Sequence, residues 1–237
     1  MKLHRFLGNF NLNSERFEIA DKEFLHQVKS VLKLRAGEKI ILGDGKNNEV
    51  LAEIENFKPK MAILKIIERR KNENEPDIDV ILYCSILKKD NFETVMQKAT
   101  ECGVKEIIPL LCQRTVKQSF KKERLEKIIK EAAEQSGRGI IPVLQNPINF
   151  KDTIKQTDDN DCNFLFDISG ETNSSFRSSQ CPFRAGLWIG PEGGWTEKEI
   201  EEARRNKFRI INLGKLTLRA ETAAVVATYL ASTKILW

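Results

Sequence analysis

Two glycine-containing connections near the end of the chain constrain its fold most. Residues 187–189 and 208–212 are apolar runs typical of buried strands, and each is followed by glycine and then by a helix-like stretch. The first connection reads I-G-P-E-G-G-W-T over residues 189–196, and the second reads L-G-K-L-T-L-R-A-E-T-A over residues 213–223. Strands that alternate with helices build parallel sheets, which bind ligands at the carboxyl ends of their strands. We therefore expect an α/β fold in which these two loops lie together.

The composition of the loops favours a ligand site over a plain turn. Pro191 biases Gly190 toward an extended backbone, while Gly193 and Gly194 allow left-handed dihedral angles and close approach of a ligand. Neither loop matches the phosphate-binding pattern G-x-x-x-x-G-K-[ST] or the dinucleotide pattern G-x-G-x-x-G. A tight strand-to-helix connection without a ligand stays open as an alternative for a single loop. Two such loops on neighbouring strands favour one shared ligand.

The chain divides into a β-rich part and an α/β part. Helical spacing of apolar residues predicts a short helix over residues 22–34, and strand-like runs cover residues 39–42, 49–54 and 61–67. The charged stretch of residues 68–77, which contains Pro76, is predicted to be a linker. We predict two domains, residues 1–72 and residues 73–237.

The second domain alternates strands with helices, which predicts a parallel sheet covered on both faces. Apolar stripes predict one helix that ends at Gly103 and another that ends at Gly137, and a capping box starts a third helix at Thr196. An alanine-rich helix is expected from Ala220 onward. The predicted strands are residues 80–86, 107–111, 164–167, 187–189 and 208–212.

Charge and cysteine usage exclude several classes of protein. The 39 basic and 34 acidic residues leave a net charge of +5, which is compatible with a polyanionic partner but is weak evidence for one. The five cysteines form no C-x-x-C pair, and the two histidines are His4 and His26, so we expect no metal site. No apolar run approaches membrane-spanning length, and we expect a cytoplasmic protein that binds no membrane.

The absence of histidine after position 26 limits the chemistry of the second domain. Catalysis by Ser-His-Asp or Cys-His groups is excluded there. The site must work by positioning, backbone dipoles and an arginine or a carboxylate, which suits an electrophile that is already activated. Methyl transfer from S-adenosylmethionine is one such reaction.

Two polar clusters have alternative interpretations. Arg219 and Glu221 begin the last helix. In one interpretation the two side chains form an exposed ion pair, and in the other Arg219 faces an anionic or carbonyl-bearing substrate. The segment of residues 131–138 ends a helix, either as a simple cap or as a place where Arg138 contacts phosphate.

The motifs resemble those of a known family. The two glycine loops are similar to the cofactor-binding signatures of SPOUT methyltransferases, and the RsmE group of 16S ribosomal RNA (uracil-N3)-methyltransferases is the most similar within that superfamily. Residues 97–104 resemble its Q-K-A-T-E-L-G-V helix, and residues 131–138 resemble its E-A-x-E-Q-S-x-R segment. Arg114-Thr115 stands where Arg-Ser is usual, and residues 26–37 resemble an H…V-L-R…G pattern. The resemblance covers nearly the whole chain.

The resemblance implies a PUA-like β-barrel that helps to bind RNA, followed by a parallel-sheet domain with a trefoil knot. It also implies a homodimer that methylates N3 of a uridine in 16S ribosomal RNA of the small subunit, and no DNA partner. Arg219 is the predicted catalytic residue, because it can stabilise negative charge on the uracil. The positions predicted to bind S-adenosylmethionine are Gly190, Pro191, Glu192, Gly193, Gly194, Leu213, Gly214, Leu216 and Leu218.

Basic residues outside the loops are predicted to contact RNA, and these are Arg5, Lys33, Arg35, Lys88, Lys89 and Arg138. Some positions depart from the family pattern: Leu216-Thr217 replaces the common Arg-Ile, Lys33 replaces an arginine, and Asn91 replaces a basic residue.

Two other functions stay open. One is a SPOUT enzyme that methylates a different nucleotide or a ribose, and the other is an RNA-binding module without catalysis. The residue that removes the proton from N3 is not assigned.

Overall fold

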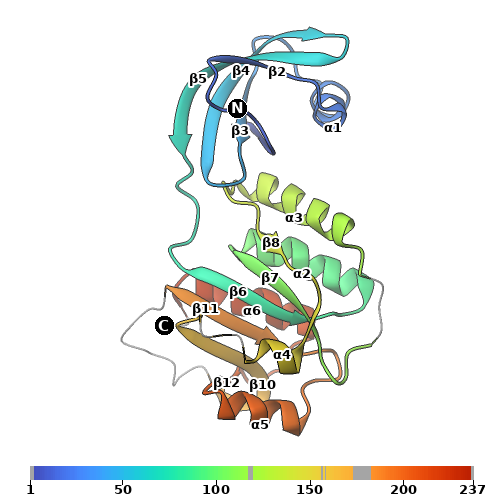
Figure 1. The fold of residues 1–237 in the computed structure, drawn as a ribbon, viewed down its shortest axis with the longest axis vertical. Helices are drawn as coiled ribbons and strands as arrows, with labels where there is room; N and C mark the ends of the chain where they lie inside the picture. Colours follow the sequence, from blue (N-terminus) through green and yellow to red (C-terminus); the bar gives the residue numbers. More distant parts are fainter. Residues whose placement is uncertain (1–2, 117–119, 156, 158, 173–182, 236–237) are drawn as a thin grey trace. The chain divides into compact units, whose positions relative to one another are not determined.

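The computed structural model describes residues 3–116, 120–155, 157, 159–172 and 183–235, and the chain divides into two compact units (Figure 1). The first unit contains the chain up to Glu75 together with Ala133–Ile141. The second contains Pro76–Ala132 and Pro142–Trp237. The segment Ala133–Ile141 thus packs with the β-rich unit, although it lies inside the predicted second domain.

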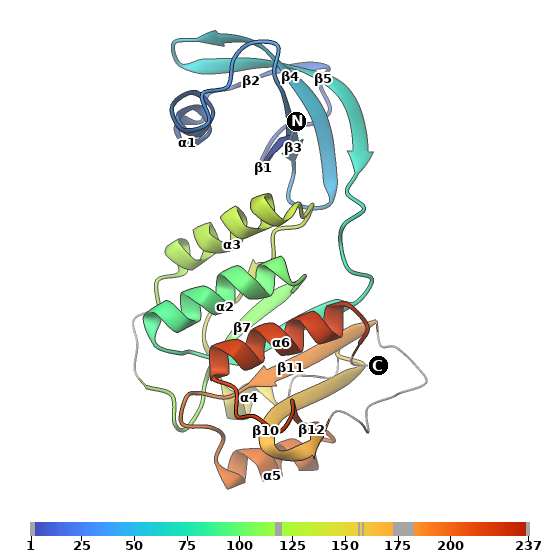
Figure 2. The ribbon, with the colours of Figure 1, turned by 180° about the vertical axis from the view of Figure 1, so that it is seen from behind.

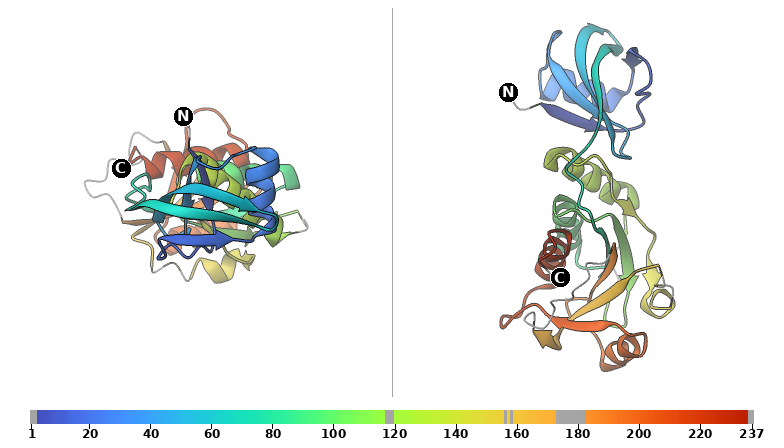
Figure 3. Two further views of the ribbon diagram at one scale, coloured as in Figure 1. Left: turned by 90° about the horizontal axis from the view of Figure 1, so that it is seen from above. Right: turned by 90° about the vertical axis from the view of Figure 1, so that its left-hand side faces the viewer.

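The first unit is a five-stranded mixed sheet with the order β1-β3-β4-β5-β2. Its first strand is parallel to β3, and the other neighbouring strands are antiparallel. The sheet curls around an apolar core that includes Phe6, Phe24, Leu42, Ile54 and Leu64 (Figure 3). The strands are β1 (His4–Leu7), β2 (Arg16–Ile19), β3 (Lys39–Gly43), β4 (Asn48–Lys58) and β5 (Met61–Lys71).

The structure differs from the sequence-based expectation at two places in this unit. The last strand continues through the charged residues 68–71, because β4 pairs with them: Leu51 lies opposite Glu68 and Glu49 lies opposite Arg70. The predicted helix is shorter: α1 (Lys22–His26) begins after Asp21, whose carboxylate accepts a hydrogen bond from the Phe24 amide, and it continues as a π-helical turn over Gln27–Val31.

The second unit is a sheet of seven parallel strands, as the alternating pattern predicts. The strand order is β12-β10-β11-β6-β7-β8, and β9 pairs with β7. The strands are β6 (Asp79–Ser85), β7 (Glu106–Leu111), β8 (Val143–Leu144), β9 (Ile148–Asn149), β10 (Cys162–Thr172), β11 (Arg184–Ile189) and β12 (Arg209–Asn212). The helices are α2 (Lys89–Glu101), α3 (Lys122–Ser136), α4 (Phe150–Thr153), α5 (Glu197–Arg205) and α6 (Ala220–Ser232), and α3 passes into the first unit at Ala133.

Helices cover both faces of this sheet. The helices α2 and α6 lie side by side on one face (Figure 2). On the other face, Phe150 of α4 and Ala203 of α5 join a core around Trp188. The indole of Trp188 stacks on the ring of Tyr83 with 4.0 Å between centroids. No helix in the described ranges is long and apolar enough to cross a membrane.

The last strand of the sheet, β12, pairs with β10 in two registers. Ile211 is opposite both Phe166 and Glu171, so β10 has an irregularity between these two residues. Within it, a Cβ on Gly170 would lie 2.6 Å from backbone atoms of Ile211, so a side chain does not fit there. The trefoil knot that the resemblance implies stays a prediction.

Candidate active site

Four loops follow parallel strands of the second unit and therefore lie at the same edge of the sheet (Figure 1). They follow β6, β7, β11 and β12, and they include both glycine loops. The sequence therefore placed the two glycine loops at one edge correctly, but the expectation that their strands are neighbours was wrong, because β10 lies between β11 and β12. The other two loops come from the neighbouring central strands, and they hold the first glycine loop in position.

The loop after β11 is a hydrogen-bonded turn fastened from two sides. Within it, the Gly194 amide donates to the Pro191 carbonyl at 2.8 Å. From β7, Arg114 Nη1 donates to the Gly193 carbonyl at 2.8 Å and to the Trp195 carbonyl at 3.2 Å. In the other direction, Glu192 Oε1 accepts a hydrogen bond of 2.9 Å from the Lys88 amide at the start of α2.

The glycines of the two loops differ in what a side chain at their position would contact. A Cβ on Gly190 would lie 3.0 Å from the Trp195 indole, so internal packing explains this residue. Gly194 and Gly214 have φ angles of +70° and +145°, and a Cβ on either would meet no atom within 4 Å. Their backbones are therefore open to a ligand. The sequence could not separate these cases, because the contact with Trp195 depends on the turn.

The loop after β12 is anchored at its start and exposed at its middle. Asn212 Oδ1 accepts from the Gly214 amide at 3.0 Å, and Asn212 Nδ2 donates to the Ile168 carbonyl at 3.0 Å. Leu216 is 81% exposed, whereas Leu213 is half-buried. The half-buried Leu218 leads into the first turn of α6.

Arg219 and Glu221 form a long ion pair at the start of α6, which was one interpretation of the sequence. Only the arginine is exposed: its side chain is 85% exposed and the Glu221 side chain is 14% exposed. Arg219 Nη1 lies 4.0 Å from Glu221 Oε1, which is too long for a hydrogen bond. Glu221 Oε2 is buried and has no hydrogen-bond partner among the residues that the structure describes.

Two buried cysteines next to the site are not nucleophiles. Burial raises the pKa of the Cys84 thiol far above its usual range, and the nearby Cys112, Glu192 and Glu221 raise it further. Burial also raises the pKa of Cys112 to about 12, and the charge of Glu199 adds to this effect. Both thiols are protonated at neutral pH, which excludes thiolate catalysis at these positions.

The residues present fit S-adenosylmethionine, the cofactor that the resemblance implies. The open backbones at Gly194 and Gly214 leave room for a flat ligand group near main-chain donors and acceptors. No grouping of three His, Cys, Asp or Glu side chains that could hold a metal ion occurs in the described part of the chain.

A cleft beside the glycine loop adds residues that sequence reasoning missed. It is lined by Arg114, Gly193, Gly194 and Trp195, by residues 167–169 of β10, and by residues of α5. The signal for Arg114 was available, because this residue follows a predicted strand of the same sheet. The contribution of residues 167–169 depends on the irregular pairing of β10 with β12, which no local pattern indicates.

Four of the residues predicted to contact RNA are exposed. Lys88 and Lys89 lie at the start of α2, next to the contact between Lys88 and Glu192. Lys33 and Arg35 are exposed in the first unit, and Lys33 has a left-handed φ of 53°.

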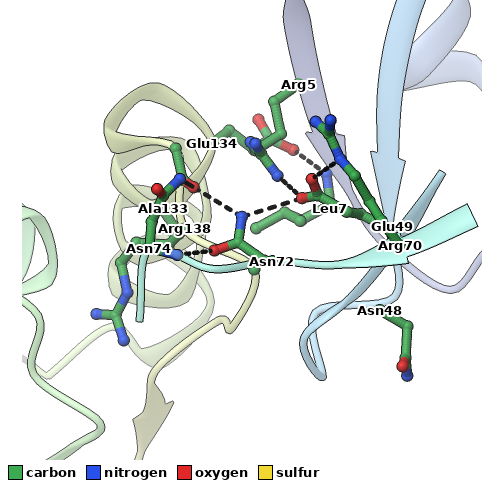
Figure 4. Close-up of polar contacts among 12 residues, drawn as sticks. Arg5, Leu7, Asn48, Glu49, Arg70, Asn72, Asn74, Ala133, Glu134 and Arg138 are labelled. Carbon is green, nitrogen blue, oxygen red and sulfur yellow. Dashed lines mark hydrogen bonds and ion pairs between the residues drawn. The ribbon is translucent and has the colours of Figure 1, made fainter. Parts of the chain in front are cut away.

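Arg5 and Arg138 have a different environment from the one predicted for phosphate contacts (Figure 4). The Arg5 side chain is 9% exposed and is paired with the buried Glu49. The Arg138 guanidinium is 5% exposed and binds both carboxylate oxygens of Glu75, at 2.7 and 3.3 Å. Buried ion pairs of this kind are structural, so neither guanidinium is presented to RNA in this structure.

The sequence matches known families in both units. Residues 73–232 match the family described as RNA methyltransferase domain, and residues 20–67 match the RNA methyltransferase PUA domain. The ribosomal RNA small subunit methyltransferase E of Rickettsia conorii is 32% identical over 231 residues, which cover 96% of this chain and 94% of that protein. The protein of the same name from Bacillus subtilis is 31% identical over 89% of this chain and 87% of its own length.

Solved structures extend this similarity to the fold. Ribosomal RNA small subunit methyltransferase E from Neisseria gonorrhoeae, bound to S-adenosylmethionine, is 29% identical, with a TM-score of 0.89 over 100% of this chain and 98% of that one. A methyltransferase from Legionella pneumophila, also with bound cofactor, is 28% identical, with a TM-score of 0.88 over 99% and 98% of the two chains. The chain therefore belongs to the RsmE family of ribosomal RNA small subunit methyltransferases.

Proposed function

We propose that this protein transfers the methyl group of S-adenosylmethionine to N3 of a uridine in 16S ribosomal RNA of the small subunit. The observation that carries the proposal is the similarity, over nearly the full chain, to small-subunit methyltransferases, including one with the cofactor bound. The shared edge of the sheet, where both glycine loops lie, is the proposed location of the reaction.

The chemistry needs little from acid–base residues. The bound cofactor supplies a methyl group on a positively charged sulfur, which makes the group electrophilic. N3 of uracil is a weakly acidic imide and must lose its proton, so negative charge develops on the two carbonyl oxygens beside N3. The proposed role of the exposed guanidinium of Arg219 is to stabilise that charge.

The cofactor contacts are proposed at the glycine loops. The open backbones of Gly194 and Gly214 favour direct contact with the ligand, and Gly190 shapes the turn through Trp195. The remaining proposed contact positions are Pro191, Glu192, Gly193, Leu213, Leu216 and Leu218.

RNA binding is proposed at exposed lysines and arginines of both units. Lys33 and Arg35 serve in the first unit, and Lys88 and Lys89 serve beside the glycine loops. We further propose a homodimer, a cytoplasmic location where small subunits are found, and functional domains of residues 1–72 and 73–237.

Labelled methyl transfer tests the function. Small subunits from cells that lack the enzyme, and naked 16S RNA as a comparison, are incubated with the protein and labelled S-adenosylmethionine. We expect label in the RNA and 3-methyluridine as the product nucleoside by mass spectrometry. A methylated ribose or another base would assign a different target, and cofactor binding by calorimetry without transfer to either substrate would favour a non-catalytic module.

A further inference from the structure

Glu221 has a buried carboxylate oxygen without a hydrogen-bond partner. Its side chain is 14% exposed, and none of the described residues donates a hydrogen bond to the buried Oε2. A buried carboxylate oxygen left unsatisfied costs free energy, and such groups in native proteins usually have a functional reason. The nearby start of α6 favours negative charge but does not supply that oxygen with a hydrogen bond.

Arg219 is the complementary case of an exposed cation with only a long ion pair in the described part of the chain. Its side chain is 85% exposed, and its Nη1 lies 4.0 Å from Glu221 Oε1. A guanidinium so exposed samples many rotamers, and fixing it costs conformational entropy. An arginine that stabilises charge during a reaction works best when a second residue fixes its orientation beforehand.

A small movement would bring the two groups into a hydrogen bond. The last torsion of the Glu221 side chain is soft, so the carboxylate can turn an oxygen toward Arg219. Shortening the 4.0 Å separation by about 1 Å would give a charge-assisted hydrogen bond. Glu192 is a second carboxylate whose charge, like that of Glu221, acts on the Cys84 thiol, and it already accepts a hydrogen bond from the Lys88 amide.

We propose that Glu221 is the positioning residue for Arg219: with cofactor bound, its carboxylate accepts a hydrogen bond from the guanidinium and holds it toward the uracil. This inference rests on the proposed methyl transfer for its catalytic meaning. The closed pair itself does not require turnover, so it can be measured separately.

The first test follows the accessibility of Arg219. The full chain is treated with a dicarbonyl reagent that modifies guanidinium groups, with and without S-adenosylhomocysteine, and modification of Arg219 is quantified by peptide mass spectrometry. Without ligand, we expect wild type and Glu221→Gln to react equally. With ligand, we expect about 10-fold protection in wild type, as for one charge-assisted hydrogen bond, and loss of most of it in Glu221→Gln. Equal protection in both proteins would overturn the proposal.

The second test is a double-mutant cycle on methyl transfer to small subunits. We expect Glu221→Gln to lower kcat by about 10- to 100-fold, with the Kd for S-adenosylhomocysteine changed less than about 3-fold. Glu221→Asp, which keeps the charge, should recover part of kcat. In the Arg219→Ala background, Glu221→Gln should change kcat by less than about 2-fold, because the two residues act as one unit.

Controls separate positioning from other roles. Glu123→Gln removes an exposed carboxylate from the first turn of α3 and should leave kcat and Kd unchanged. A weaker Kd with unchanged kcat in Glu221→Gln would make Glu221 a cofactor ligand and overturn the proposal, as would additive effects in the cycle. If wild type transfers no methyl group, the proposed function fails, while the modification experiment still decides whether Glu221 holds Arg219.

Discussion

The arginines of this protein have different roles because their side chains lie in different environments. Arg138 is almost fully buried and shares two hydrogen bonds with Glu75, whose carboxylate also accepts from the Gly139 and Ile140 amides. Arg219 is exposed and unfixed at the candidate active site. A buried, paired guanidinium contributes to the folded structure, whereas an exposed one is available to a substrate.

Replacing Arg138 should therefore affect stability more than RNA binding. In Arg138→Ala, Glu75 keeps its charge in a largely buried place without its cation, and we expect a loss of about 3–5 kcal/mol in the free energy of unfolding. Denaturant unfolding measures this loss. The exposed Arg35→Ala is the matched control, which should weaken RNA binding at unchanged stability. A stable Arg138→Ala protein with weak RNA binding would contradict the structural role.

At the scale of elements, the glycine loop after β11 depends on its neighbours. Arg114 reaches it from the end of β7 and binds two of its carbonyl groups, and Glu192 connects it to the start of α2. A turn with several glycines has many accessible conformations, so contacts from rigid strands select one of them. The loop is therefore part of a site built by three consecutive strands of the sheet.

Shortening the Arg114 side chain, which holds the glycine loop after β11, should weaken cofactor binding. Lysine at position 114 keeps the charge but is one atom shorter, so its ammonium does not reach the position of Arg114 Nη1, which donates to both carbonyls. We expect Arg114→Lys to raise the Kd for S-adenosylhomocysteine by about 10-fold, the loss of one hydrogen bond to a charged group. Isothermal calorimetry measures it, and Arg205→Lys, in an exposed pair with Glu201, is the control. An unchanged Kd would show that the contacts from Arg114 are not needed for cofactor binding.

Local patterns predicted most elements but missed those whose stability comes from pairing. The apolar run at residues 80–86 and the helical stripe ending at Gly103 correspond to β6 and α2. In contrast, β1 and β2 have four residues each, and both are too short to show a periodicity. The charged end of β5 forms a strand because β4 offers it hydrogen bonds, which no side-chain pattern reports.

At the scale of the whole molecule, each unit has its own core, and the first unit contains a buried polar network. Glu49, 3% exposed, accepts hydrogen bonds from Arg5, Arg70 and Asn72. Asn72 also donates to the Gly137 carbonyl, which joins Ala133–Ile141 to the sheet (Figure 4). The network therefore connects stretches that are far apart in the sequence.

The network makes the stability of the first unit depend on acid. Burial alone would raise the pKa of Glu49, but hydrogen bonds from Asn72, Arg5 and Arg70 outweigh it and lower the pKa below its usual 4.5. A lowered carboxylate pKa adds stability that is fully present above the unfolded value and is lost as the pH falls through the folded one. We expect the first unit to lose stability below about pH 4.5, and Glu49→Gln to lose it already at neutral pH.

Amide hydrogen exchange within β3, β4 and β5 measures this effect in the first unit. The tryptophans are residues 188, 195 and 237, so their fluorescence follows the second unit in the same samples. Protection in the first unit that is equal at low and neutral pH would rule out the predicted role of Glu49.

The sequence by itself determined the fold class, the family and the position of both glycine loops, because periodicity, turn residues and motif spacing are local properties. It could not assign a role to each polar residue in those motifs. Burial, pairing and exposure depend on residues distant in the chain, such as Glu75 for Arg138, Trp195 for Gly190 and the unpartnered carboxylate of Glu221 beside Arg219. Only the tertiary structure brings these partners together, and it decided which arginines are buried in ion pairs and which one stays exposed at the start of α6.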